Sequence, residues 1–279
     1  MPYRTILLER RDGIAVVTLN RPRKKNAINP TMNREMIALL EALRYDDRVR
    51  VLVITGAGDA FCSGLDLKEM IIDLKDDPAA YDRMNRSVME WRGRTLKYYP
   101  KPTIAMVNGY CFGGAFAIVE GCDLALAADD ATFGLSEINF KVFPAGAVSK
   151  AIANLLRPRD ALWYALLGRP FDGARAAQIG LVNQAVPRAR LRRETMTIAR
   201  ELAAKDPHAL KATKDAYRHS LAMSWDTAMS YALAKEMELV QQQGDAWRRE
   251  GIGDFLEGKY RPGLGERSRP SATKRTRRR

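Results

Sequence analysis

Two glycine-rich turns carry residue types that could do chemistry in this chain. Gly113-Gly114 precedes an apolar segment of helical character, and Gly64 precedes a second helical segment. The first N–H groups of a helix have no intrahelical acceptor and lie at the positive end of its dipole, and glycine lets a ligand approach them. Such N–H groups can stabilise a developing negative charge. The same glycines would also permit close packing of a helix on a strand, so the motif alone leaves both roles open.

Glu137 is the candidate acid or base. Its apolar neighbours in the sequence are Phe133, Leu135, Ile138 and Phe140. A carboxyl group buried among such side chains is desolvated, which raises its pKa towards a range useful for proton transfer to carbon. A surface or helix-capping glutamate after Ser136 is the alternative that the sequence leaves open.

Histidine and cysteine chemistry is disfavoured by the composition. The chain has two histidines, His208 and His219, and three cysteines without zinc-ligand or disulfide spacing. We therefore expect no metal site, no histidine-based triad, and reduced thiols of the kind found in cytoplasmic proteins. Neither a signal peptide nor an apolar run of membrane-spanning length is indicated.

Strand candidates stand directly before the glycine turns. Val51–Thr55 precedes the Gly64 turn, Thr103–Val107 precedes Gly113-Gly114, and Asp123–Ala127 follows the second helix. An N-terminal hairpin is expected over residues 3–19, and from residue 190 onward the pattern is helical. Strands that alternate with helices and then give way to helices alone predict an α/β core with a helical extension.

Together these segments resemble the enoyl-CoA hydratase/isomerase superfamily, the crotonases, over about residues 3–263. The resemblance is carried by Arg21-Pro22, Asn26-Ala27, SGLDLKEM (63–70), KPTIAMVNG (101–109), Gly113-Gly114, CDLALAADDATFGLSEI (122–138) and Gly180-Leu181-Val182. Within the superfamily, NREM, KPTIAMVNGYCFGG and ATFGLSEIN are most similar to the hydroxycinnamoyl-CoA (feruloyl-CoA) hydratase-lyases. The resemblance implies a crotonase-type spiral of ββα units over residues 1–188 and a helical trimerisation region over 189–265. Residues 266–279 are expected to form a disordered basic tail.

The resemblance also implies the parts of a site. It places the two donors of an oxyanion hole on the backbone N–H groups of Leu65 and Gly114, and the acid/base on Glu137. The residues that it implies for coenzyme A are Lys24, Lys25 and Lys68 at the phosphates and the backbone of Ala27, Asp66 and Leu67 at the adenine.

The sequence departs from the family pattern at positions expected to contact the acyl group of the substrate. Two-acid hydratases carry a water-activating glutamate where this chain has Ala117, and hydratase-lyases carry a serine there. Glu120, one helical turn on, is expected to be structural. Met70 and Leu233 stand where the lyases place tyrosines that hold a phenol. The tyrosines that could take over that role are Tyr231, Tyr81 and Tyr110, although the sequence favours an aromatic core or interface residue at each of these positions.

The predicted function is acyl-CoA processing, with hydration and retro-aldol cleavage of a hydroxycinnamoyl-CoA to acetyl-CoA and an aromatic aldehyde such as vanillin. An enoyl-CoA hydratase or double-bond isomerase is the alternative enzyme. We expect a cytoplasmic homo-oligomer, a trimer or dimer of trimers, without a cofactor beyond the coenzyme A of the substrate. Residues 266–279 supply +6 of the net charge of +13, leaving +7, which suits an anionic thioester. An RNA-binding homologue, with contacts from Lys274 to Arg279, is the alternative of another class.

Overall fold

The computed structural model describes residues 3–259, and its larger sheet has six strands in the order β1-β2-β3-β5-β7-β10. Their bounds are β1 Ile6–Arg11, β2 Ile14–Leu19, β3 Val51–Gly56, β5 Thr103–Val107, β7 Leu124–Ala128 and β10 Gln184–Val186. The first two form an antiparallel hairpin, and every later pair is parallel. Asp12 and Gly13 turn the hairpin at φ values of 52° and 75°. All residues of β3 and β5 are buried, because helices cover both faces of a parallel sheet.

A second, smaller sheet runs in the order β4-β6-β8-β9. Its strands are β4 Ala60–Cys62, β6 Tyr110–Phe112, β8 Thr132–Gly134 and β9 Phe171–Asp172. Strands β3, β5 and β7 of the larger sheet are each followed at once by one of these short strands and then by helix. This repeat produces the predicted spiral of ββα units and aligns the ends of β4, β6 and β8.

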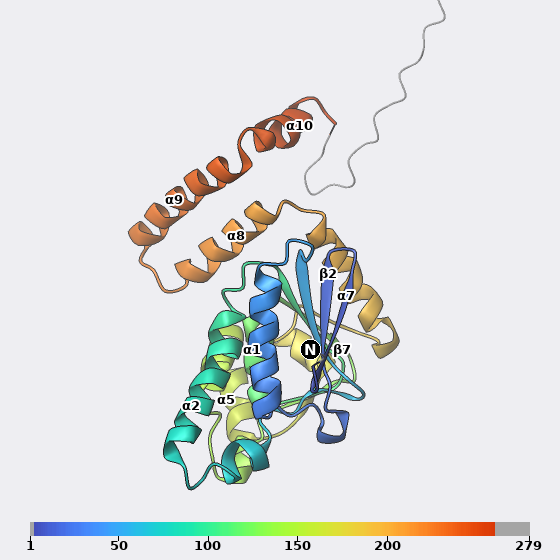
Figure 1. The fold of residues 1–279 in the computed structure, drawn as a ribbon, viewed down its shortest axis with the longest axis vertical. Helices are drawn as coiled ribbons and strands as arrows, with labels where there is room; N and C mark the ends of the chain where they lie inside the picture. Colours follow the sequence, from blue (N-terminus) through green and yellow to red (C-terminus); the bar gives the residue numbers. More distant parts are fainter. Residues whose placement is uncertain (1–2, 260–279) are drawn as a thin grey trace, which may run out of the picture. The chain divides into compact units, whose positions relative to one another are not determined.

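Helices connect and cover the two sheets. Their bounds are η1 Pro22–Lys24, α1 Pro30–Arg44, η2 Lys68–Ile72, α2 Pro78–Met89, η3 Glu90–Thr95, η4 Gly113–Ala115, α3 Phe116–Gly121, η5 Glu137–Phe140, α4 Ala147–Leu155, α5 Pro158–Leu167, α6 Gly173–Gln178, α7 Arg188–Ala203 and α8 Pro207–Ser220. In Figure 1, α1 and α7 lie on either side of the strands. Helix α7 packs on β2, β3, β5 and β7 and buries Leu191, Thr195 and Ala199 at helical spacing.

The chain divides into two compact units, residues 1–218 and 219–279. Helix α7, which begins at the predicted end of the core at residue 188, packs on the larger sheet. The predicted domain bounds stay a prediction. The second unit contains α9 Trp225–Gln243, η6 Trp247–Gly253 and α10 Asp254–Leu256. The predicted tail, residues 266–279, lies outside the described residues. Within residues 3–259, no helix is both long and apolar enough to cross a membrane.

Candidate active site

The two glycine turns contact each other. Strand β4 leads into Gly64, β6 leads into Gly113, and the two strands are parallel neighbours, so both turns emerge at the same edge of the small sheet. Gly64 has a φ of +91°, and a Cβ atom on it would lie 3.1 Å from the Gly114 nitrogen and 3.0 Å from the Phe112 carbonyl oxygen. Glycine is therefore needed at position 64 for two reasons: its backbone is left-handed, and two backbone segments approach each other closely there.

Each turn offers a peptide N–H group without an acceptor. A bridge joins Leu65 to Ile28, in which the Ile28 N–H donates to Gly64 at 2.8 Å and the Asp66 N–H donates to Ile28 at 2.9 Å. Within the described residues, this pattern leaves the Leu65 N–H without an acceptor. Gly114 lies in the first turn of η4, where N–H groups have no intrahelical acceptor. Two free donors thus lie on contacting backbones.

Glu137 completes this group. It begins η5 just after β8, and its Oε1 atom lies 2.9 Å from the position that a Cβ atom on Gly113 would occupy. Its Oε2 atom is buried and has no hydrogen-bond partner in the described part of the chain. Burial raises the pKa of Glu137, as expected. The carboxyl group is therefore adjacent to the turn that carries Gly114.

The source of that burial differs from the sequence-based expectation. Phe133 and Leu135 are fully buried, but Ile138 and Phe140 are 41% and 61% exposed. The last two point outward because they lie in the short helix η5 beyond the small sheet. Of the surroundings of the Glu137 carboxyl group, the structure shows the backbone of Gly113 next to its Oε1 atom.

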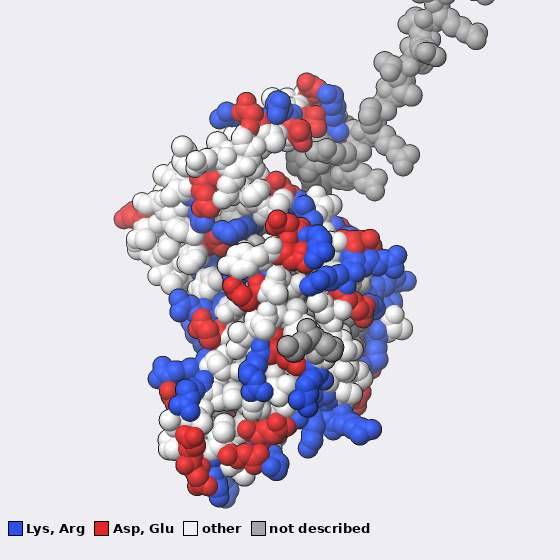
Figure 2. All heavy atoms as spheres, viewed as in Figure 1, with Lys and Arg blue, Asp and Glu red and all other residues white. Residues whose placement is uncertain are grey.

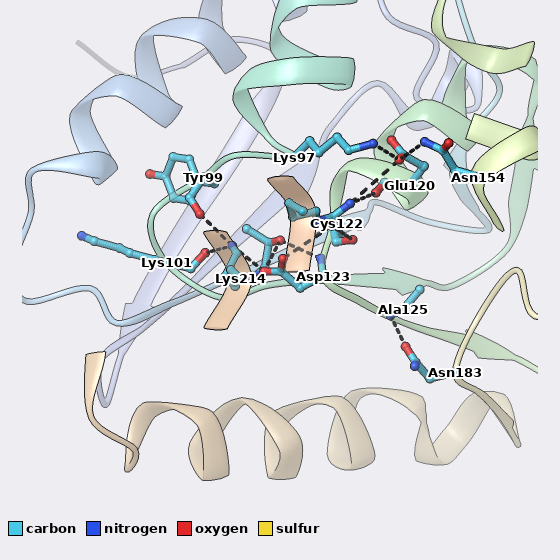
Figure 3. A network of polar contacts seen from close by, with 12 residues as sticks. Lys97, Tyr99, Lys101, Glu120, Cys122, Asp123, Ala125, Asn154, Asn183 and Lys214 are labelled. Atoms are coloured by element: carbon cyan, nitrogen blue, oxygen red, sulfur yellow. Dashed lines mark hydrogen bonds and ion pairs between the residues drawn. The ribbon is translucent and has the colours of Figure 1, made fainter. Parts of the chain in front are cut away.

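Helix α3 provides no second acidic side chain next to Glu137 and the two glycine turns. Ala117, at the second-acid position, is fully buried. Glu120 is buried too, but it accepts hydrogen bonds from Lys97 at 2.6 Å and from Asn154 at 2.8 Å. Figure 3 shows it in a polar network that also contains the ion pair of Asp123 and Lys214. Glu120 therefore has the structural role expected from its position one helical turn after Ala117.

Arg92 is a site residue that the sequence did not indicate. Its side chain is buried, and its Nη1 group donates to the Gly114 carbonyl oxygen at 2.5 Å. Burial lowers the pKa of Arg92 to about 10, so the group stays a cation at neutral pH. Arginines in amphipathic helices are ordinarily exposed, and no pattern around this one predicts burial.

The residues expected to bind coenzyme A lie along two adjoining segments. The Ser63 N–H donates to Lys25 at 2.9 Å, which joins residues 24–28 to residues 63–68. The Lys25 ammonium pairs with Asp59 and lies 4.7 Å from the centre of the Tyr110 ring. Within this group, the side chains are exposed at Lys24, Leu67 and Lys68 and buried at Ala27 and Asp66.

The remaining acyl-group candidates belong to two different compact units. Met70 is buried in η2, next to the turn that carries Leu65. Tyr231 and Leu233 belong to the second unit, so their place in an acyl pocket stays a prediction. Tyr81 and Tyr110 are about two-fifths exposed, at 40% and 41%.

A partly buried carboxyl group beside two free peptide N–H groups is equipped for proton transfer at a carbon next to a carbonyl group. The chain belongs to the enoyl-CoA hydratase/isomerase family, whose profile matches residues 9–262. It is 44% identical over 266 residues to a hydroxycinnamoyl-CoA hydratase-lyase from Pseudomonas fluorescens, covering 94% of this chain and 96% of the relative.

Solved structures agree with this assignment. An enoyl-CoA hydratase from Mycobacterium smegmatis superposes with a TM-score of 0.84 at 27% identity, covering 91% of this chain and 97% of the other. An enoyl-CoA hydratase subunit I from Geobacillus kaustophilus gives 0.83 at 31% identity, covering 95% and 99%. The spiral of ββα units is therefore the crotonase fold.

Proposed function

We propose that this chain is a hydroxycinnamoyl-CoA hydratase-lyase, which hydrates the side-chain alkene of its substrate and then cleaves the product to an aromatic aldehyde and acetyl-CoA. The observation that carries the proposal is the 44% identity to such an enzyme over 94% of the chain. The site supports it, because the Oε2 atom of Glu137 is buried without a hydrogen-bond partner in the described part of the chain, and Ala117 stands where two-acid hydratases carry a second acid.

The Leu65 and Gly114 N–H groups would bind the thioester oxygen and stabilise the enolate that forms there. Their contacting backbones and free donors support this role. The segments around residues 24–28 and 63–68 would hold coenzyme A, with Lys24, Lys25 and Lys68 near its phosphates.

Glu137 would act first as a base and then as an acid in each step. As a carboxylate it takes a proton from water while the water oxygen attacks C3, and the alkene electrons move to the thioester oxygen. The same proton is then delivered to C2, which completes hydration. In the retro-aldol step Glu137 takes the C3 hydroxyl proton, the C2–C3 bond breaks to leave the enolate of acetyl-CoA, and the C3 oxygen becomes the aldehyde carbonyl. The proton then passes to C2. A raised pKa suits a group that must alternate between both forms near neutral pH.

A para-hydroxyl group on the substrate would compensate for the missing second acid, which in two-acid hydratases activates the attacking water. Its electrons can reach C3 through the ring and the alkene, so that a quinone-methide-like form makes C3 receptive to water. An aliphatic enoyl-CoA offers no such assistance. Selectivity for phenolic esters therefore follows from the absence of a carboxyl group at Ala117.

A panel of acyl-CoA esters with product analysis tests the proposal. We expect aldehyde and acetyl-CoA in equal amounts from 4-coumaroyl- or feruloyl-CoA, suppression by a para-methyl ether, and very slow hydration of crotonyl-CoA. Fast crotonyl-CoA hydration without aldehyde from the phenolic esters would refute the lyase function. Migration of a 3-enoyl double bond would favour an isomerase, which also needs one acid.

We further infer a cytoplasmic homo-oligomer, a trimer or dimer of trimers, that uses no cofactor beyond the coenzyme A of its substrate. The three buried free thiols fit a reducing compartment, and the proposed hydration and retro-aldol cleavage need only proton transfers in addition to water. The oligomer is inferred from the crotonase family. On the face drawn in Figure 2, basic side chains are interspersed with acidic ones, an arrangement that does not favour RNA binding.

A further inference from the structure

Arg92 is a buried cation without an anionic partner among residues 3–259. It is 3% exposed, its Nε group donates to Val88 at 3.2 Å, and Nη1 donates to Gly114. Its Nη2 group donates to no atom of that part of the chain. Nearby Cys62 supplies no charge, because burial raises the pKa of its thiol to about 11. Buried charges are ordinarily paired, so an unpaired guanidinium points to a ligand.

Arg92 lies against the helical segment formed by η4 and α3. The Arg92 carbonyl oxygen lies 2.5 Å from the position that a Cβ atom on Gly121 would occupy, and Nη1 overlaps the corresponding position on Gly114. Gly114, Ala117 and Gly121 are separated by three and four residues and therefore share one side of the helix. The two glycines leave room for Arg92, and Ala117 lies between them on that side of the helical segment.

The position of Ala117 identifies the substrate atom that Arg92 would meet. In two-acid crotonases the side chain at this position activates the water that attacks C3. Here the Arg92 guanidinium group lies against Gly114, about one helical turn before Ala117 on the same side of the helical segment. A guanidinium cannot accept a proton from water, but it can donate hydrogen bonds to an oxygen that becomes negative.

We propose that Arg92 binds the oxygen at C3 of the acyl group through its Nη2 group. It would hold the water as it attacks, the C3 oxygen as Glu137 removes its proton, and the aldehyde oxygen as the C2–C3 bond breaks. The guanidinium neither gains nor loses a proton in these steps. The inference rests on the proposed lyase function and gives Arg92 a catalytic role in it.

The test compares a reaction at C3 with one that involves C2 alone. The first assay is aldehyde release from 4-coumaroyl-CoA. The second is solvent deuterium exchange at C2 of 3-(4-hydroxyphenyl)propanoyl-CoA, which has no oxygen at C3 and requires only Glu137 and the two N–H donors. Arg92→Met removes the charge and keeps most of the volume, and Arg92→Lys keeps the charge. Arg94→Met is the matched control, because Arg94 lies in the same helical segment with a side chain that is 74% exposed.

We expect Arg92→Met to lower aldehyde release by about 100-fold, as for a lost donor to a developing oxyanion, and to change exchange less than about threefold. Arg92→Lys should fall between Arg92→Met and the unmodified protein, and Arg94→Met should match the unmodified protein in both assays. Equal losses in both assays would overturn the inference, because Arg92 would then act through the Gly114 turn. Unchanged aldehyde release would overturn it as well.

A binding measurement keeps the inference testable if Arg92→Met does not fold. 3-Hydroxy-3-phenylpropanoyl-CoA and 3-phenylpropanoyl-CoA differ only in the C3 oxygen, and neither carries the para-hydroxyl group. The unmodified protein should bind the first about tenfold more tightly, as expected of a charged hydrogen bond, and Arg92→Lys should lose part of that preference. Equal binding of both esters by the unmodified protein would overturn the inference. Failure of the lyase function itself would appear separately, as the absence of aldehyde from every phenolic ester.

Discussion

Replacing Gly64 with alanine tests whether the contact between the two glycine turns sets the geometry of the site. The left-handed φ of +91° makes an alanine there unfavourable by about 1–2 kcal/mol. The new Cβ atom would also lie 3.0 Å from the Phe112 oxygen and 3.1 Å from the Gly114 nitrogen, two backbone atoms that cannot rotate away. The turns must then separate by a few tenths of an ångström. Since a shift of about 1 Å costs roughly 100-fold in rate, this separation should lower kcat about three- to tenfold.

The assay is kcat for aldehyde release, together with thermal unfolding followed by circular dichroism. Gly180→Ala is the matched control, with a φ of +85° and a nearest atom, the Leu155 oxygen, at an ordinary 3.5 Å. Both variants should lower Tm by roughly 2–8 °C, but only Gly64→Ala should lower kcat. Full kcat in Gly64→Ala, or an equal loss in Gly180→Ala, would refute the reasoning.

Three further predictions concern Glu137, Gly114 and Ala117. Burial raises the pKa of Glu137 above its ordinary 4.5, so the folded state holds this proton more tightly than the unfolded state, and stability falls as pH rises from 4.5 through the raised pKa. Calorimetry should therefore show a higher Tm for Glu137→Gln at neutral pH and a vanishing difference below pH 4.5; an equal Tm throughout would contradict this. Gly114→Val places a Cβ atom on the Arg92 guanidinium and should lower kcat by roughly 100- to 1,000-fold with an unchanged circular dichroism spectrum. In Ala117→Glu the new carboxylate should pair with Arg92. A double-mutant cycle of Ala117→Glu and Arg92→Met, with free energies of unfolding measured in urea, should therefore give a coupling energy of at least about 1 kcal/mol. Additive effects of the two substitutions would argue against their proximity.

The larger sheet was predictable because its strands are continuous apolar segments. Thr103–Val107 is β5 as predicted, and β3 and β7 agree with their predicted bounds to within two residues. The strands of the small sheet have only two or three residues each, which is too short for a period-two pattern to be distinguished from a turn. Their pairing depends on contacts between segments far apart in the sequence.

The parts of the site that could be predicted are those where the backbone requires a glycine or where a family motif is present. Gly64 and Gly114 are fixed by local conformation and close approach, both of which leave a signal in the sequence. The burial of Glu137 was expected, but half of its supposed apolar neighbours are exposed. Arg92 left no signal, because its burial results from how η3 packs against α3.

The measurement that tests the central claim most directly is turnover of 4-coumaroyl-CoA by Glu137→Gln, with ester affinity measured alongside. If Glu137 is the single acid/base, kcat should fall by roughly 100- to 10,000-fold while the Kd for the thioester stays unchanged. Glutamine keeps the shape of the side chain but can neither take up nor release the proton. Turnover near that of the unmodified protein in a folded Glu137→Gln variant would contradict the account.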